Sequence, residues 1–269
     1  MIPEDEARKK TGERPNGVVD LDAKRSMVPR SPNHEHELAS LVAASKQIAS
    51  MAEPTKLTPE ELDAKKIIYP EMADHSVIDS FRELRTKLTQ LARGENQITM
   101  ITSVCPRGGS THVALNLAAA FSLDESKTSL LIDCNLRNPG LHDRLYLDPE
   151  YGLTDFLEKE VVGIDSIIYA TGIHRLRLIP VGRRREAASE FFTSLRMKAF
   201  LDVLKRRYPD RHIFVDAPPV GSSADARILS HLCDRSILVV PYGRVLESQV
   251  FSAVDALGED KLAGVILNK

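Results

Sequence analysis

The stretch ITMITSVCPRGGSTHVALNLAAAF, residues 98–121, decides the fold class. It begins with a short apolar run (98–104), continues through a glycine-rich turn and passes directly into a segment with helical spacing. A phosphate-binding loop requires this context, because the backbone N–H groups of the turn and the helix N-terminus surround an anion. Gly108 and Gly109 permit close backbone approach. Thr111 stands where the pattern G-x-x-x-x-G-K-[ST] has its magnesium-binding hydroxyl.

Two positions of this stretch depart from the pattern. Val104 occupies the first glycine position and Ser110 occupies the lysine position. The lysine normally neutralises charge on the β- and γ-phosphates, so its loss removes a central electrostatic element of phosphoryl transfer. On this segment alone, an ordinary strand–turn–helix connection is therefore the favoured interpretation.

The rest of the chain alternates apolar runs with helical stretches. Several runs are almost continuously apolar, which is typical of strands buried on both faces. The alternation predicts an α/β fold with a mostly parallel, doubly wound sheet flanked by helices. The further runs lie at 129–133, 176–181, 212–218, 236–241 and 262–267, and helical stretches begin near Thr111, Ser189, Ser222 and Glu247.

Carboxylates end two of the expected strands. Asp133 closes the second run and is followed by Asn135, and Asp216 closes the run at 212–218. Ligands of open α/β sheets bind beyond the carboxyl ends of the strands, where such side chains hold Mg²⁺ and its waters. A single aspartate there is more often a helix cap or turn former. Two beside a glycine-rich turn favour a phosphate site.

Composition and charge restrict the setting. The net charge is −2 with 28% charged residues, so no nucleic-acid partner is expected. Cys105, Cys134 and Cys233 lack metal-type spacing, which favours a reducing compartment. The N-terminus carries no secretory signal and no apolar run approaches the roughly 18 residues of a membrane span, which predicts a cytoplasmic protein.

The first 73 residues are expected to be a largely disordered extension. Within it, residues 36–52 have helical apolar spacing, which predicts a short amphipathic helix that packs on its own domain or docks a partner. Residues 53–72, with three prolines and mixed charge, are interpreted as a linker. The P-loop domain is expected at residues 74–269, beginning with an amphipathic helix from about His75.

The stretch from about 74 to 269 resembles the bacterial tyrosine kinases (BY-kinases) and the cytoplasmic ATPase domains of polysaccharide co-polymerases. The resemblance implies the P-loop NTPase fold of the deviant Walker A type. Plasmid-partition and division-site-positioning ATPases share the layout but usually lack the arginine helix, so they rank second. The matching segments, in family order, are DSFRELRTKL (79–88, ring-forming helix), TSVCPRGGSTHVALNLA (102–118, Walker A, usually P-G-x-G-K-S/T), LLIDCNLRNPGLH (130–142, usually D-x-D-x-R-x-P), SEFFTSLRMKAFLDVLK (189–205), FVDAPPV (214–220, Walker B, usually I-D-T-P-P) and GVILNK (264–269).

This resemblance implies ATP or ADP and Mg²⁺ as cofactors. The metal and its waters would be held by Thr111, Asp133 and Asp216, and the catalytic positions would be Asp133, Asn135 and Asp216. The nucleotide would be bound by Pro106, Arg107, Gly108, Gly109, Ser110, Thr111 and His112, with Asn268 near the base. A homo-oligomeric ring would form through Arg82, Glu83 and Arg85.

The resemblance also implies a role in exopolysaccharide or capsule biosynthesis, export and chain-length regulation. The chain ends at Lys269 without the family's tyrosine cluster and carries no membrane activator domain, so it matches the separate cytoplasmic form. That form would lie at the inner face of the membrane through an inner-membrane polysaccharide co-polymerase. Ser110 and Asn135, whose amide cannot accept a proton, predict a tyrosine-protein autokinase that is catalytically weak or inactive.

Two alternatives stay open from the sequence. The first is a working kinase, or an ATPase of the partition or division-site type, in which Arg107 or His112 near the loop supplies the missing charge. A solvated loop residue is the more common role for an arginine such as Arg107. The second alternative is a ring scaffold that binds no nucleotide.

Overall fold

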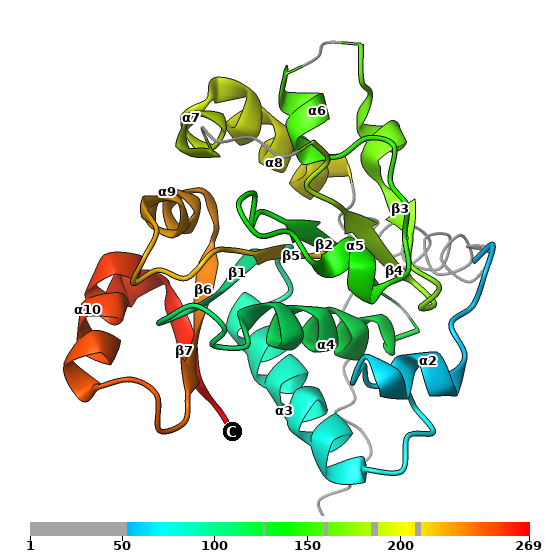
Figure 1. The fold of residues 1–269 in the computed structure, drawn as a ribbon, viewed down its shortest axis with the longest axis horizontal. Coiled ribbons are helices and arrows are strands. Elements are labelled where there is room, and N and C mark those ends of the chain that lie inside the picture. The colour runs from blue at the N-terminus through cyan, green and yellow to red at the C-terminus, as the bar shows by residue number, and fades with distance from the viewer. Residues whose placement is uncertain (1–52, 126, 159–160, 184–187, 208–210) are drawn as a thin grey trace, which may run out of the picture. The chain divides into compact units, whose positions relative to one another are not determined.

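The apolar runs of the sequence form one sheet (Figure 1). The computed structural model describes residues 53–269 apart from 126, 159–160, 184–187 and 208–210, all within the second of the chain's two units, Leu41–Lys269. In this part of the chain the strand order is β3-β4-β2-β5-β1-β6-β7. The six expected strands are β1 (Ile98–Ser103), β2 (Thr128–Asp133), β4 (Leu176–Ile179), β5 (Arg211–Asp216), β6 (Arg235–Pro241) and β7 (Leu262–Asn268).

Neighbours among these six strands all pair in parallel, which confirms the predicted sheet type. The seventh strand, β3 (Tyr169–Ala170), pairs antiparallel with β4. The sequence analysis missed it because two residues are too short to show any periodicity. The central strand β1 lies between β5 and β6. From β1 the chain continues to β2 on one side of the sheet, and from β6 it continues to β7 on the other side. Ligands of open α/β sheets bind at the carboxyl ends of strands where the connections change direction in this way.

Helices cover both faces of the sheet, as the doubly wound fold requires (Figure 1). On one face, α3 (His75–Ala92) and α4 (Ser110–Ser122) share a core that includes Ile78 and Phe81. On the other face lie α7 (Ala188–Thr193), α8 (Leu195–Arg207), α9 (Ala224–Leu232) and α10 (Glu247–Leu257). Short elements complete the described chain: α2 (Pro59–Ala64), α5 (Leu141–Arg144), α6 (Leu153–Glu158), and the 3-10 turns η2 (Ile164–Ile167) and η3 (Glu259–Lys261).

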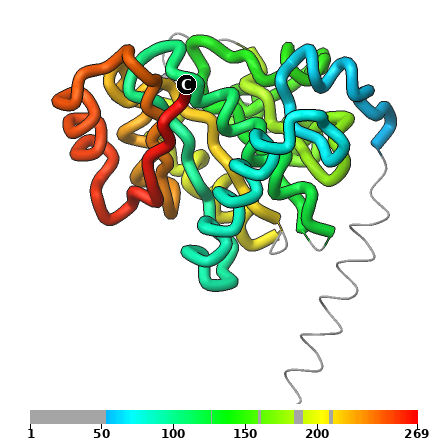
Figure 2. The backbone as a smooth tube through the Cα atoms, turned by 90° about the horizontal axis from the view of Figure 1, so that it is seen from below, coloured from blue at the N-terminus to red at the C-terminus, as the bar shows by residue number. Residues whose placement is uncertain are grey.

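The edge strand β7 lies between α10 and α3, as the ribbon and the tube views both show (Figures 1 and 2). Its residues are less buried than those of the central strands, and Val265 and Leu267 are exposed. Among the helices of the described residues, none is long and apolar enough to cross a membrane.

The interpretation of residues 53–72 as a linker is wrong. Thr58 and Glu61 form a capping box that starts α2, with Pro59 in its first turn. Ile67 and Ile68 are only 1% and 2% exposed and belong to the core beneath α4. The prolines and charges dominated the composition, while the two adjacent isoleucines gave no periodic signal. The helix expected near 36–52 lies outside the described residues.

Candidate nucleotide-binding site

The turn between β1 and α4 has the backbone of a phosphate-binding loop. Gly109 is the N-cap of α4 with φ 95° and makes no side-chain capping bond, so the first N–H groups of the helix are left for an external acceptor. A Cβ on Gly108 would lie 2.6 Å from Ser103 Cβ and 2.9 Å from the carbonyl oxygen of Cys105, so this position requires glycine for steric reasons. Gly109 is required by its φ of 95°, and a Cβ there would also displace the Asn268 side chain.

Arg107 adopts a left-handed backbone with φ 58°. The Walker A pattern P-G-x-G-K-S/T has glycine at this position, and the structure shows that the conformation suited to glycine is retained with an arginine in place. The carbonyl of Arg107 accepts a hydrogen bond from Arg244 Nη1 at 2.9 Å. This contact holds the strained turn from outside the loop.

Asp133 and Asp216 are direct partners in the β2–β5 register, at the carboxyl ends of both strands. Asp133 is fully buried, and its carboxylate accepts bonds from the N–H groups of Asn135, Gly140 and Leu141 at 3.1–3.3 Å. Burial nevertheless raises the pKa of Asp133 to about 6. The N–H donors oppose that rise, because they stabilise the charged form.

Asp216 is 1% exposed, and burial followed by repulsion from Asp133 raises its pKa well above the ordinary value. The Thr111 side chain donates a hydrogen bond that opposes the rise. Among the described residues, no group donates to Asp216 Oδ1. Two buried carboxylates, one with a free oxygen, beside a hydroxyl form a site that a divalent cation would neutralise.

These residues fit Mg²⁺ of the P-loop kind. Within the described ranges, no group of three or more His, Cys, Asp or Glu side chains could hold a metal ion by itself. A cation here would therefore be held by Thr111, by Asp133 and Asp216 directly or through waters, and by oxygens of a bound phosphate.

A cavity of about 590 Å³ opens over the loop, between the β2–α5 turn and the segment after β5. Small-molecule sites typically span about 300–1,000 Å³. Three arginine side chains border the cavity, namely Arg107, Arg137 and Arg144. Arg137 also forms an ion pair with the buried Asp225 at 3.5 Å. Arginine side chains therefore bring positive charge to the cavity wall, although residue 110 carries none.

Arg144 is the residue that sequence reasoning missed. It ends the four-residue helix α5, and its charge lowers the pKa of both Asp216 and His112, although burial has the larger effect on each. Nothing in the segment LHDR distinguishes it from a solvated turn. Only the path of the chain after Asp133 brings it to the cavity.

The predicted loop residues all line this cavity: Pro106, Arg107, Gly108, Gly109, Ser110, Thr111 and His112, together with Asn135. Ser110 is the first residue of α4 and is 7% exposed. Burial, then Arg144 and Lys66, lower the pKa of His112. His112 is therefore neutral at pH 7 and does not replace the charge of a lysine.

Asn268 lies behind the loop rather than along the cavity wall. Its Nδ2 donates to the carbonyl of Gly108 at 3.1 Å, and its own carbonyl accepts from the N–H of Tyr242 at 2.7 Å. It therefore ties β7 to the loop backbone. Its placement near a base stays a prediction.

The three predicted ring residues lie together on α3. Arg82 pairs with Asp79 at 3.2 Å and Glu83 with Lys87 at 2.7 Å. Arg85 Nη1 donates to the carbonyl of Ala120 at 2.8 Å, which joins α3 to α4. These contacts are all within the chain, so the ring stays a prediction.

Comparison with known proteins gives a consistent set of relatives, although no protein-family model matches the chain. The tyrosine-protein kinase YwqD of Bacillus subtilis is 34% identical over 194 residues, which cover 71% of this chain and 80% of that protein. The tyrosine-protein kinase CpsD of Streptococcus agalactiae is 30% identical over 192 residues, covering 70% and 81%. The tyrosine-protein kinase wzc of Salmonella typhimurium is 31% identical over 194 residues, 71% of this chain and 26% of that protein.

Solved structures agree with the sequence relatives. The kinase domain of the Escherichia coli tyrosine kinase ETK superposes with a TM-score of 0.67 at 25% identity and covers 84% of this chain and 92% of that one. The VpsO kinase domain gives 0.65 at 26%, with 72% and 94% covered. The cell division ATPase MinD of Pyrococcus furiosus gives 0.53 at 22%, with 64% and 72% covered, and shares the fold alone.

Proposed function

Because the chain belongs to the bacterial tyrosine-protein kinase family, we propose that it binds ATP or ADP with Mg²⁺ at the phosphate loop and transfers phosphate to tyrosine weakly or not at all. The observation that carries this proposal is the pairing of an intact cradle with Ser110 at the first position of α4. The Walker A pattern of the family has lysine there.

The binding half rests on the loop and the carboxylates. The N–H groups at the start of α4 and the glycines of the loop suit a phosphate chain. Thr111, Asp133 and Asp216 would hold Mg²⁺, which when bound neutralises charge on the phosphate oxygens. The arginines that border the cavity add attraction for a polyanion.

The catalytic half rests on two substitutions. A serine hydroxyl at position 110 supplies no positive charge to the transferring phosphate. Removal of one transition-state contact of this kind typically costs about 10²–10³-fold in rate. Asn135 at the cavity wall offers an amide where the family pattern has a carboxylate, and an amide does not take the proton of an accepting hydroxyl.

A working kinase is the second candidate, and one observation favours it. Arg137 borders the cavity from the β2–α5 turn and Arg144 from the end of α5, so positive charge reaches the site from a side other than position 110. A guanidinium can take up the charge that develops on a phosphoryl group, as arginine fingers do. His112, being neutral, supports neither candidate.

The proposed cellular role is inferred from the family to which the chain belongs. We propose a part in exopolysaccharide or capsule synthesis or export and its chain-length control, beside an inner-membrane polysaccharide co-polymerase partner at the inner face of the membrane. Assembly into a ring through Arg82, Glu83 and Arg85 belongs to the same proposal. The support is the likeness to tyrosine kinases such as CpsD and wzc and the placement of the three side chains on α3.

The test is a titration of the full chain with a fluorescent ATP analogue, with and without Mg²⁺, followed by a transfer assay. We expect Mg²⁺-dependent binding by wild type and faster transfer by Ser110→Lys. If wild type binds no nucleotide, the proposal fails and the alternative of a ring scaffold that binds no nucleotide is supported. A wild-type rate that Ser110→Lys does not improve, but Arg144→Gln abolishes, would establish the working kinase.

A further inference from the structure

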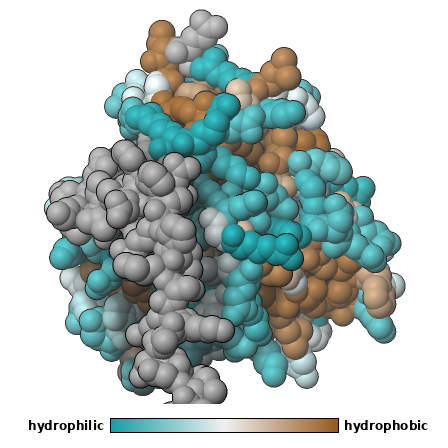
Figure 3. Space-filling model, turned by 180° about the vertical axis from the view of Figure 1, so that it is seen from behind, coloured by the Kyte–Doolittle hydropathy of each residue, from teal (hydrophilic) through white to brown (hydrophobic). Residues whose placement is uncertain are grey.

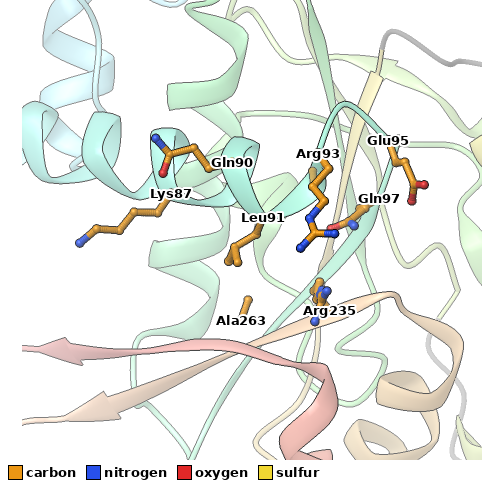
Figure 4. Close-up of a pocket in the computed structure, with 9 residues that line it drawn as sticks. Lys87, Gln90, Leu91, Arg93, Glu95, Gln97, Arg235 and Ala263 are labelled. Carbon is orange, nitrogen blue, oxygen red and sulfur yellow. The ribbon is translucent and has the colours of Figure 1, made fainter. Parts of the chain in front are cut away.

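A second cavity lies at the opposite end of the sheet from the phosphate loop. We name it the α3–β7 groove; it is lined by Lys87, Gln90, Leu91, Ala92, Arg93, Glu95, Gln97, Arg235 and Ala263 and has a volume of about 700 Å³ (Figure 4). Strand β1 begins at Ile98 beside the groove and ends at Ser103 beside the loop. A ligand in the groove would thus be separated from the nucleotide by the length of β1.

Two local features open this groove. Helix α3 ends because Arg93 and Gly94 both turn left-handed, with φ 50° and 84°. On the other side, Ser236 pairs with Leu262 and Ile237 with Gly264, so Ala263 is the extra residue of a β-bulge. A bulge bends its strand locally and is common beside functional sites. The helix end and the bulged strand leave Leu91 44% exposed at the groove.

The charges at the groove are arranged for an anion. Figure 4 shows the Arg93 side chain extending toward Arg235, which lines the same groove, while Glu95 is directed away from Arg93. Arg235 Nη1 is held by the carbonyl of Asp260 at 3.1 Å. In the described part of the chain, neither guanidinium forms a salt bridge, and Lys87 is paired with Glu83. Two like charges that line one groove repel each other, and an anion bound between them removes that repulsion.

We propose that the α3–β7 groove binds a tyrosine-phosphorylated peptide segment. A phosphotyrosine carries about −1.5 to −2 charge at pH 7, which two guanidiniums match in number and in bidentate geometry. Its ring requires an apolar surface, which Leu91 and Ala263 provide in the same groove as the arginines. The proposal rests on the proposed function to the extent that this family modifies tyrosine.

The experiment measures fluorescence anisotropy of a fluorescein-labelled hexapeptide with one phosphotyrosine, titrated with the full chain. Arg93→Asn removes one charge while keeping a residue that tolerates the left-handed backbone, and Arg235→Gln removes the other. Each variant should weaken binding by about tenfold or more. Arg206→Gln is the matched control, because Arg206 is exposed on α8 and does not line the groove. It should bind as wild type does.

Leu91→Ala separates the ring from the phosphate. It should weaken the phosphotyrosine peptide several-fold and leave competition by inorganic phosphate unchanged. Equal binding of the unphosphorylated peptide, or unchanged binding by both arginine variants, overturns the proposal. Competition by inorganic phosphate as strong as that by the phosphopeptide reduces the groove to a simple anion site and also overturns it.

The same variants are titrated with the ATP analogue. Arg93→Asn and Arg235→Gln should bind Mg–ATP as wild type does, since the groove lies at the far end of β1. Normal nucleotide binding with no phosphopeptide binding means that the groove proposal alone fails. Phosphopeptide binding without nucleotide binding means that the proposed function alone fails.

Discussion

Raising the pH in the absence of Mg²⁺ should destabilise this protein through its two buried carboxylates. Both have raised pKa values in the folded chain, so between the ordinary aspartate range and those values the folded state binds more protons than the unfolded state. The free energy of unfolding therefore falls as pH rises through this window. For Asp133 the window runs from 3.8 to about 6, and for Asp216 it extends higher in the same direction.

The size of the effect follows from the shift of Asp133. One pKa unit corresponds to about 1.4 kcal/mol, so a rise from 3.8 to about 6 amounts to about 3 kcal/mol once the pH exceeds 6. Both side chains are buried, so solvent does not screen the loss. Mg²⁺ should restore the lost stability, because it binds only the ionised pair.

The assay is urea unfolding with EDTA at pH 4, 6 and 8, on wild type and on Asp216→Asn. The variant cannot ionise at position 216, so its free energy of unfolding at pH 8 should exceed that of wild type by more than about 1.4 kcal/mol, the equivalent of one pKa unit. The difference should be small at pH 4, where the ordinary aspartate carboxyl of the unfolded chain begins to ionise. The melting temperature of the variant in EDTA should rise by about 3–6 °C. Asp202→Asn, exposed on α8, is the control and should follow wild type. Equal pH dependence of wild type and Asp216→Asn would refute the argument.

Three further changes test the site and its support. Gly109→Ala should abolish nucleotide binding, measured with the fluorescent analogue, because an alanine at φ 95° is strained and its Cβ displaces the Asn268 side chain that bonds the loop. Ile68→Ala should lower the free energy of unfolding by about 2–5 kcal/mol in urea titration, since Ile68 is 2% exposed in the core. An unchanged urea midpoint would support the interpretation of residues 53–72 as a linker. Arg144→Gln should weaken ATP binding by about tenfold without changing the melting temperature, and unchanged affinity would remove Arg144 from the site.

The sequence predicted the strands and helices that are long enough to show a regular apolar pattern. Six strands and the main helices followed from apolar runs and helical spacing, because burial on both faces of a parallel sheet leaves a continuous apolar signal. The strand β3 and the helix α5 are two and four residues long, so they have no period to detect. Ile67 and Ile68 were missed for a related reason, since two adjacent apolar residues specify no periodicity.

The residues of the candidate site were predictable from the sequence to a similar extent. Residues within one motif, such as Thr111 and Asp216, could be placed by their position at strand and helix ends. Residues that reach the site from elsewhere could not: Arg144 arrives through the turn after β2, and Arg244 holds the loop from the segment after β6. Their roles depend on tertiary distances that no local spacing encodes.

Ser110→Lys tests whether the missing charge acts on the resting site as well as on transfer. Position 110 adjoins Thr111, whose side chain donates to Asp216, so an ammonium there should lower the pKa of Asp216 and flatten the pH dependence of stability in EDTA. Transfer should rise by about 10²–10³-fold. Ser110→Met, of similar length but neutral, should do neither. A flatter pH profile without faster transfer would place the remaining defect at Asn135, and Asn135→Asp combined with Ser110→Lys should then restore the rate. If Ser110→Lys, like Ser110→Met, leaves both the pH dependence of stability and the transfer rate of wild type unchanged, a charge at position 110 has no part in this site.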